Sequence, residues 1–391
     1  MRICLISEEY PTPSSGWGGI GTYTYNLAHG LSREGESVFV ISRSEGEEEE
    51  YQDGSILVYC IPAINFPIPF LHPYLNIFGY SLAVKRKLKK IIEEERIEVV
   101  EAPEYAAEAF FFSRAKKRIP LLVRLHTPHI ITEEICGIIP NFYSRIVRWM
   151  EKETTIHANA ITSPSRSIAE LCQVKIGFRN PFSVIPNPID TSQFLKVDYQ
   201  CRLPEYLLLY VGKLQDLKNV KVLMQVLPRV LRRFPKVRLR LIGGDTLTGP
   251  KGGSYREMME GLAQELKVER SVEFLDMKPR NELIEHYQQA RLAIFPSLFE
   301  NFPYTCLEAM SCGCPVIGSR VGGLPEMIEE GVSGFLFQLD NIGELTEKIV
   351  TLLSDPSLAE KMGDEAARRV RLYYSQEVII PQVLNVYRGL I

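Results

Sequence analysis

The sequence predicts an α/β protein of two doubly wound domains. Short apolar runs alternate along the chain with stretches in which apolar residues recur at helical spacing, the pattern of parallel sheets with crossover helices. The alternation pauses once, at the Pro-rich and polar segment 186–200, and a second series of elements follows it. The chain has 391 residues, which suits two domains of about 190 residues each.

The first series begins with an apolar strand at residues 3–7. A helix follows, because apolar residues recur at helical spacing from Ile20 to Leu31, and Gly35 supplies its stop. Further strand-like runs lie at 38–42, 56–61, 98–101, 121–125 and 160–163. Helical segments separate most of these runs.

The second series begins with a strand at 207–211 and a helix from about Lys218, with Pro228 as a candidate kink. A strand at 237–242 and a helix near 256–266 come next. Strands at 272–275, 292–295 and 316–318 follow, and the last helix lies at 376–390. In doubly wound domains ligands bind at the carboxyl ends of the strands. The cleft between the two domains is therefore the expected site.

Composition excludes several classes of protein. Hydrophobic residues at 45% and charged residues at 24% are those of an ordinary globular protein, which excludes a disordered chain. Lys and Arg total 45 against 48 Asp and Glu, a formal net charge of −3, without the basic excess of a nucleic-acid binder. The eight cysteines form no C-x-x-C pair, and the N-terminus is too polar for a signal peptide. We therefore expect buried thiols and a cytoplasmic protein.

Two carboxylates flank a helix start that follows the strand at 292–295. Pro303 suits the first turn, which leaves Glu300 on the preceding loop and Glu308 in the helix. The unpaired N–H groups of that start favour an anion. Glu308 is placed to accept hydrogen bonds from a vicinal diol, and Glu300 from a second polyol. The alternative is that both are solvated glutamates on either side of a turn.

Lys213 and Lys218 flank a strand-to-helix turn, where two ammonium groups would bind a phosphate. The alternative is that each lysine is simply solvated. The segment G-W-G-G-I-G at 16–21 formally matches a dinucleotide fingerprint. However, Gly16 lies nine positions after Ser7, and the second strand does not end in an acid, so we do not expect NAD or FAD. The glycines still permit close approach of the backbone to a phosphate or sugar.

Two histidines follow the predicted strand at 121–125, in R-L-H-T-P-H. At the end of such a strand His126 faces the cleft. A metal site from His126 and His129 lacks further ligands at suitable spacing, so we expect no metal.

Together these features resemble the GT-B-fold retaining glycosyltransferases of family GT4, also called glycosyltransferase group 1, over nearly the whole chain. The family's E-x7-E motif is matched by Glu300 and Glu308. Its Gly-Gly loop after the first strand is matched by Gly18 and Gly19.

Three further motifs carry the resemblance. The basic pair of the C-terminal domain is matched by Lys213 and Lys218, although the first is commonly Arg. The phrase S-V-I-P-N-P-I-D at 183–190 resembles the family's linker, with Pro188 where Gly is usual. G-G-L-P-E at 322–326 is also typical.

The resemblance implies a GT-B fold of two Rossmann-like domains facing across a cleft. Residues 1–190 would form the acceptor-side domain and 191–375 the domain that binds a nucleotide-sugar donor. The helix at 376–391 would cross back onto the first domain.

The resemblance also implies roles for individual residues. Lys213 and Lys218 would hold the donor diphosphate, and Glu300 the donor sugar, while Glu308 would hold the ribose and His126 would lie beside the transferred sugar. The implied donor-binding set is Gly18, Gly19, Gly243, Met277, Lys278, Asn301, Phe302, Pro303, Tyr304, Thr305, Leu307 and Glu308. Within it Gly243, Met277 and Lys278 would receive the base through their backbone.

The expected activity is transfer of a hexose, with retention, from a UDP- or GDP-sugar to a glycan, lipid-linked or small-molecule acceptor, as in polysaccharide biosynthesis. No D-x-D motif is present, so lysines and backbone N–H groups would meet the diphosphate charge without metal or cofactor. Two alternatives remain open: a GT-B-fold epimerase or hydrolase acting on a nucleotide sugar, and a non-catalytic sensor of one.

One charge-free segment, 55–84, is long enough to cross a membrane, but four prolines argue against a spanning helix. Aromatic residues in its second half precede five cations within 85–90, which suits contact with anionic lipid. The hypothesis is peripheral membrane contact through 66–90. The alternative is that the aromatic residues pack in the core or line the acceptor cleft. The three glutamates at 93–95 would then balance the charge of the basic run on one solvated helix.

Overall fold

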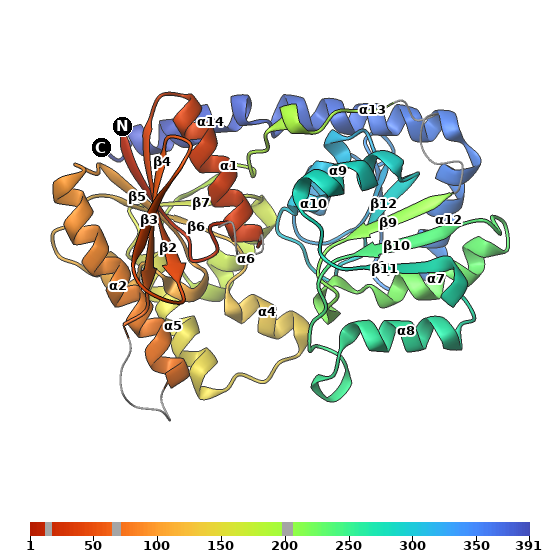
Figure 1. Ribbon diagram of the computed structural model, residues 1–391, viewed down its shortest axis with the longest axis horizontal. Helices are drawn as coiled ribbons and strands as arrows, with labels where there is room; N and C mark the ends of the chain where they lie inside the picture. Colours follow the sequence, from red (N-terminus) through yellow and green to blue (C-terminus); the bar gives the residue numbers. More distant parts are fainter. Residues whose placement is uncertain (12–17, 65–71, 198–205) are drawn as a thin grey trace. The chain divides into compact units, whose positions relative to one another are not determined.

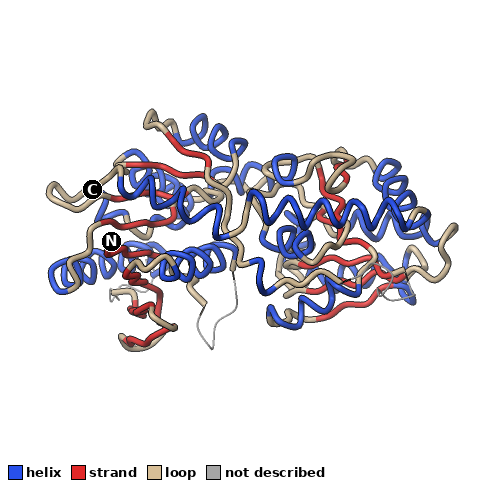
Figure 2. Tube along the Cα trace, turned by 90° about the horizontal axis from the view of Figure 1, so that it is seen from above, coloured by secondary structure: helices blue, strands red, loops and turns tan. Residues whose placement is uncertain are grey.

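The computed structural model of the protein describes residues 1–11, 18–64, 72–197 and 206–391. Within them the chain forms two compact units: unit 1 comprises Met1–Asp190 and Gln376–Ile391, and unit 2 comprises Thr191–Ser375. Each unit is a mainly parallel sheet with helices on both faces (Figures 1 and 2). The α/β, doubly wound class that the sequence predicts is therefore confirmed.

Unit 1 contains an eight-stranded sheet in the order β3-β4-β2-β1-β5-β6-β7-β8. Its strands are β1 (Arg2–Ile6), β2 (Ser37–Ser44), β3 (Glu49–Asp53), β4 (Ile56–Pro62), β5 (Val99–Pro103), β6 (Leu121–Arg124), β7 (Ala160–Ser163) and β8 (Phe182–Val184). Its helices are α1 (Gly19–Arg33), α2 (His72–Glu94), α3 (Phe110–Ser113), α4 (His129–Cys136), α5 (Phe142–Ile156), α6 (Arg166–Ile176) and α14 (Gln376–Arg388). Neighbouring strands are parallel except β3, which is antiparallel to β4.

Helix α14, the end of the chain, belongs to unit 1 and lies against α1 (Figure 1). Gly30 permits this contact, because a Cβ there would come within 2.5 Å of the Ile380 side chain. Tyr387 donates a hydrogen bond of 2.6 Å to one oxygen of the buried Glu101, and Tyr23 of α1 donates one of 2.7 Å to the other. The final helix thus completes the core of unit 1.

Unit 2 contains a six-stranded parallel sheet in the order β11-β10-β9-β12-β13-β14. Its strands are β9 (Leu207–Val211), β10 (Arg238–Ile242), β11 (Val272–Leu275), β12 (Leu292–Phe295), β13 (Val316–Ser319) and β14 (Phe335–Phe337). Its helices are α7 (Lys221–Leu231), α8 (Tyr255–Glu265), α9 (Arg280–Gln289), α10 (Tyr304–Ser311), α11 (Leu324–Met327), α12 (Ile342–Ser354) and α13 (Pro356–Tyr373). Helices α7 and α8 lie on one face, and α9 and α10 on the other (Figure 1).

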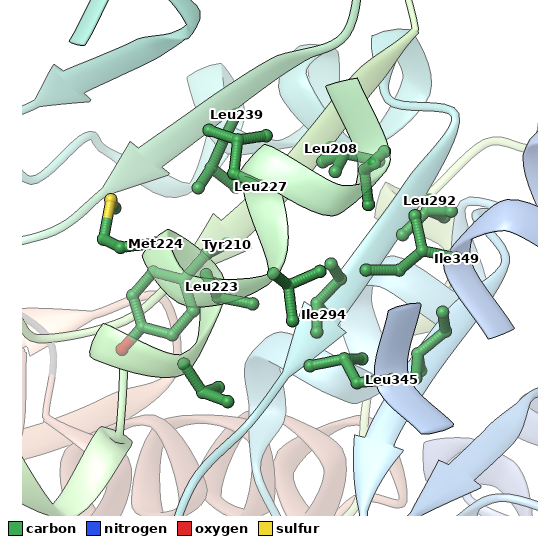
Figure 3. Packing of buried hydrophobic residues seen from close by; sticks show 14 of the residues in the cluster. Leu208, Tyr210, Leu223, Met224, Leu227, Leu239, Leu292, Ile294, Leu345 and Ile349 are labelled. Carbon is green, nitrogen blue, oxygen red and sulfur yellow. The ribbon is translucent and has the colours of Figure 1, made fainter. Parts of the chain in front are cut away.

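The central strands of unit 2 are apolar throughout because both faces of the sheet are covered. All five residues of β9 are buried, and so are all four of β12. Figure 3 shows Leu208 of β9, Leu227 of α7 and Ile349 of α12 gathered in this core. The loops that follow these central strands are therefore anchored in a packed core, which can position their side chains for chemistry.

Three short strands have no counterpart among the predicted elements. β3 is an acidic, largely exposed edge strand, so it follows no apolar pattern. β8 and β14 have three residues each, too few for a periodic signal. The helix predicted from Lys218 begins at Lys221 instead, because the 3-10 turn η5 (Asp216–Lys218) precedes it. Pro228 lies within α7.

The charge-free segment is only partly described. Residues 65–71 lie outside the described residues, and α2 begins at His72. Among the helices of the described segments, none is both long and apolar enough to cross a bilayer.

Candidate active site

The strand order of unit 2 reverses between β9 and β12, since β10 and β11 follow on one side and β13 and β14 on the other. In an open parallel sheet this reversal opens the crevice where ligands bind. The two loops that leave these strands are joined by hydrogen bonds. Leu298 donates its N–H to the Leu217 carbonyl at 2.9 Å, and the Asn219 amide donates to the Pro296 carbonyl at 3.2 Å.

An ion pair spans this reversal point. The Lys218 Nζ, from the loop after β9, lies 2.6 Å from the Glu300 Oε1, from the loop after β12. Ser297 donates its hydroxyl to the same oxygen at 2.6 Å. Only 23% of the Lys218 side chain and 10% of the Glu300 side chain are exposed, so the pair is largely shielded from water. Both described bonds use Oε1, so Oε2 keeps its accepting capacity for a ligand.

Two glycines hold Glu300 in place. Gly323 donates its N–H to the Glu300 carbonyl at 2.9 Å. Gly322 has a φ of +51°, and a Cβ there would lie 1.8 Å from the same carbonyl oxygen. Only glycine fits so close a contact. The G-G-L-P-E motif therefore supports the loop that carries the first glutamate of E-x7-E.

The second glutamate, Glu308, is buried in α10, whose N-cap is Pro303. Its Oε1 lies 3.3 Å from the Arg280 Nε, and its Oε2 accepts a 3.1 Å hydrogen bond from the Tyr287 hydroxyl. Burial raises the pKa of Glu308, while Arg280 and Tyr287 act in the opposite direction. The Arg280 Nη1 and Nη2 are buried and make no hydrogen bond to the described residues. Glu308 is thus held in a fixed orientation beside a cation.

Other donor-site candidates of unit 2 lie near the same strand ends. Lys213 follows β9 and is exposed, and no ion pair forms at its side chain in the described part of the chain. At Gly243, after β10, a Cβ would lie 1.9 Å from the Gly212 carbonyl oxygen, so the backbone there is closely approached. Met277, after β11, is 49% exposed, and Lys278 pairs with Glu282 at 3.2 Å.

The residues between the two glutamates divide by burial. Asn301 and Thr305 are half-buried. The side chains of Phe302, Tyr304 and Leu307 are buried, and Leu307 is wholly inaccessible. Leu307 therefore supports α10 from the core and does not present its side chain to a ligand in this structure.

In unit 1, His126 follows β6 and is fixed by buried neighbours. Its backbone N–H donates to the Glu104 Oε2 at 2.6 Å, and the Tyr23 ring meets its imidazole edge-on at 5.4 Å between centroids. Burial, with a smaller effect of the nearby Arg124 charge, lowers the pKa of His126 to about 3. The imidazole is therefore neutral near pH 7.

Glu104 is a buried carboxyl beside this histidine. Burial first, and the nearby Glu151 second, raise the pKa of Glu104 to about 8, and its Oε1 has no hydrogen-bond partner within the described segments. His129 instead pairs with Glu151, with 2.5 Å between the ring Nδ1 and Oε1. The two histidines thus have different carboxyl partners. The described residues contain no group of three or more His, Cys, Asp or Glu side chains arranged to hold a metal ion.

The glycines at the start of α1 have unequal roles. A Cβ at Gly18 would lie 2.1 Å from the Glu9 carboxylate, and one at Gly21 would lie 1.9 Å from the Glu9 carbonyl oxygen. Gly19 has open space around it. Gly18 and Gly21 therefore accommodate Glu9, while the space beside Gly19 is not filled by the described residues. Residues 16 and 17 of the motif lie outside the described residues.

Both units of the chain match known protein families. Residues 17–193 match the family model described as Glycosyltransferase Family 4, and residues 193–369 match that described as Glycosyl transferases group 1. The chain belongs to glycosyltransferase family GT4. This GT4 enzyme is 28% identical to the D-inositol 3-phosphate glycosyltransferase of Corynebacterium urealyticum, over 100% of the chain and 96% of the relative.

Solved structures show that the enzyme has the GT-B fold. Sucrose-phosphate synthase from Thermosynechococcus elongatus matches with a TM-score of 0.83 at 23% identity, covering 100% of this chain and 98% of that one. Anabaena HepE, solved in complex with UDP-glucose, matches with a TM-score of 0.75 at 19% identity, covering 100% of both chains.

Sequence reasoning missed three polar residues that contact candidate site residues of the two units. Arg280 and Tyr287, the partners of Glu308, lie seven residues apart in α9 and so share one helix face, a spacing visible in the sequence. Glu104 gave no signal, because a lone glutamate after a strand is usually solvated.

Proposed function

We propose that this GT4 enzyme transfers a hexose from a UDP- or GDP-sugar to an acceptor hydroxyl, with retention of the anomeric configuration. The observation that carries the proposal is the Lys218–Glu300 pair across the strand-order reversal of unit 2. A cation for the diphosphate and a carboxylate for sugar hydroxyls stand side by side where such a sheet binds its ligand. The HepE structure, which contains UDP-glucose, supports a nucleotide-sugar donor.

The donor diphosphate is assigned to Lys213 and Lys218. Lys213 is exposed without a described ion pair, and Lys218 exchanges part of its contact with Glu300 for phosphate oxygens when the donor binds. The two cations stabilise the negative charge that grows on the leaving diphosphate. Gly19, at the start of α1, supplies its backbone to a phosphate.

Glu308 is assigned to the ribose hydroxyls. Arg280 favours the ionised carboxylate, which is the form that accepts two hydrogen bonds from a diol. The base lies against the backbone at Gly243, Met277 and Lys278. The sugar contacts Glu300 and the segment 301–305 that follows it.

Transfer with retention proceeds by front-face attack in this proposal. The acceptor oxygen bonds to the anomeric carbon as the bond from that carbon to the diphosphate oxygen breaks, and the acceptor proton passes to the departing phosphate. Neutral His126 serves as a hydrogen-bond partner of the transferred sugar rather than as a cation. Lysines and backbone N–H groups meet the diphosphate charge, so we propose that no metal ion is required.

The acceptor is proposed to be a glycan, a lipid-linked sugar or a small polyol, in cytoplasmic polysaccharide biosynthesis. The name of the Corynebacterium urealyticum relative, D-inositol 3-phosphate glycosyltransferase, supports a polyol among these candidates. Membrane contact through 66–90 is retained as part of this proposal. In the described part of that segment Arg86, Lys89 and Lys90 are exposed, whereas Lys87 is buried and pairs with Glu48 at 2.7 Å.

A donor screen followed by product analysis tests the proposal. UDP- and GDP-sugars are ranked by the thermal shift that each produces, since a ligand bound to the native state raises its stability. The best donor is then incubated with and without candidate acceptors, and the anomeric configuration of the product is read by NMR. Lys218→Ala is the control. An inverted product, an epimerised donor, or fast hydrolysis that no acceptor suppresses would overturn the proposal.

A further inference from the structure

Helix α5 of unit 1 and the loop before it expose large apolar side chains close together in the sequence. Of twelve large apolar residues exposed in the described chain, four lie within 138–149: Ile138 (53%), Ile139 (89%), Phe142 (69%) and Trp149 (47%). Exposing such side chains to water is unfavourable in free energy, and covering them is favourable. A third of the exposed apolar residues in twelve positions is a patch rather than the scatter normal for a surface.

The arrangement follows from the sequence of α5. Phe142, Arg145, Trp149 and Lys152 are spaced by three, four and three residues, so they share one helix face, and all four are exposed. The opposite face of α5 is buried, with Met150 in the core. Ile138 and Ile139 lie in the short loop between α4 and α5, after the left-handed Gly137 that ends α4. We call Ile138, Ile139 and the four exposed residues of α5 the α5 face.

The α5 face carries uncompensated positive charge. Arg145 and Lys152 form no ion pair among the described residues. The acidic side chains nearest to them in sequence are already paired: Glu133 with Arg148, Glu134 with Lys175, Glu151 with His129 and Glu153 with Arg114. A partner that covers the α5 face must therefore accept both apolar side chains and cations.

Trp149 of this face also packs against the core. Its indole meets the buried Phe110 ring edge-on, with 5.0 Å between centroids, while about half of its surface stays exposed. Trp and Phe beside Lys and Arg is the composition of surfaces that enter the headgroup region of a bilayer. Helix α2, which contacts α5 (Figure 1), also exposes the cations Arg86, Lys89 and Lys90.

We propose that unit 1 docks on an anionic lipid bilayer through the α5 face, with Ile139, Phe142 and Trp149 entering the headgroup region and Arg145 and Lys152 contacting lipid phosphates. This proposal deepens the membrane contact included in the proposed function and does not depend on the donor or the reaction. Each cation contributes about fivefold to partitioning onto anionic membrane.

Co-sedimentation of the full-length protein with vesicles tests this docking. Vesicles of phosphatidylcholine alone and of phosphatidylcholine with phosphatidylserine are compared at low and high salt. Binding is expected only to the anionic vesicles, with loss at high salt. Ile139→Asp should weaken binding at least tenfold without a change in melting temperature, because its side chain is 89% exposed. Leu247→Asp, at a position 75% exposed in unit 2, is the matched control and should bind normally.

A second pair of variants separates the charge from the apolar contact. Arg145→Gln with Lys152→Gln should lower binding to anionic vesicles roughly 25-fold, whereas Arg232→Gln with Arg233→Gln in unit 2 should not. Absence of binding to anionic vesicles at low salt would overturn the proposal, and so would equal losses in the test and control variants. A dimer in lipid-free sedimentation velocity that Ile139→Asp converts to a monomer would assign the α5 face to a second copy instead.

Discussion

Glu300→Gln should change the affinity for the nucleoside diphosphate and for the nucleotide sugar in different ways. In the ligand-free structure the Glu300 carboxylate lies 2.6 Å from the Lys218 ammonium, where it competes with a donor phosphate for that cation. The amide of Gln removes the charge but can still accept the Ser297 hydroxyl. The substitution should therefore release Lys218 while leaving the loop intact.

The expected magnitudes follow from the burial of the pair. A largely shielded but not fully buried ion pair contributes about 1 kcal/mol, so the diphosphate should bind up to about fivefold more tightly. Hydrogen bonds from sugar hydroxyls to a charged carboxylate are worth about 1.5–3 kcal/mol. The ratio of the two dissociation constants, nucleotide sugar over diphosphate, should therefore rise roughly 10- to 100-fold.

Isothermal titration calorimetry with the two ligands measures this ratio directly. Lys218→Ala is the matched control, because it should weaken both ligands and leave the ratio nearly unchanged. Equal weakening of both ligands by Glu300→Gln would refute the assignment of Glu300 to the sugar. A weaker diphosphate with an unchanged nucleotide sugar would refute the competition for Lys218.

Four further outcomes are expected. Lys218→Ala should lower kcat by about two orders of magnitude or more at saturating donor, whereas Lys213→Arg should retain activity because the charge is kept; near-normal turnover of Lys218→Ala would exclude its role. Arg280→Gln removes the cation that opposes the raised pKa of Glu308, so donor affinity measured from pH 8 to 5 should begin to fall at a higher pH than in the wild type; superimposable curves would contradict this. Because the pKa of Glu104 is raised in the folded state, the free energy of unfolding of the wild type relative to Glu104→Gln should be highest below about pH 4.5 and should fall as pH rises to about 8. Urea unfolding of both proteins at pH 5, 6.5 and 8 measures this difference in stability, and a difference that stays constant with pH would disprove the prediction. Activity should survive EDTA, and a loss that Mg²⁺ or Mn²⁺ restores would show that a metal is needed.

The sequence was a good guide to the sheets because their central strands are buried on both faces. A run such as Leu207–Val211 can be recognised without any partner, since every residue in it is apolar. The edge strand Glu49–Asp53 could not be found in this way. Its residues are acidic and exposed, and only its pairing with β4 makes it a strand.

The candidate site was predictable as a set of residues but not as a set of contacts. Lys218 and Glu300 each have a local signal, a turn after an apolar strand. Their ion pair depends on β12 lying next to β9 rather than next to β11, which no local pattern specifies. The burial of Leu307 and the place of Arg280 beside Glu308 likewise follow from tertiary packing.

The hydrogen bond from Tyr387 to Glu101 has a consequence for how the protein is synthesised. Unit 1 contains both the first and the last residues of the chain, with all of unit 2 between them. At a translation rate of about 5–20 residues per second, the first part of unit 1 waits roughly 10–40 s for its last helix. During that time the α1 surface around Gly30 and the Glu101 carboxylate lack their partners. We therefore expect unit 2 to finish folding first on the ribosome, and a chain cut short before residue 376 to fail in the half of the protein that was made earliest.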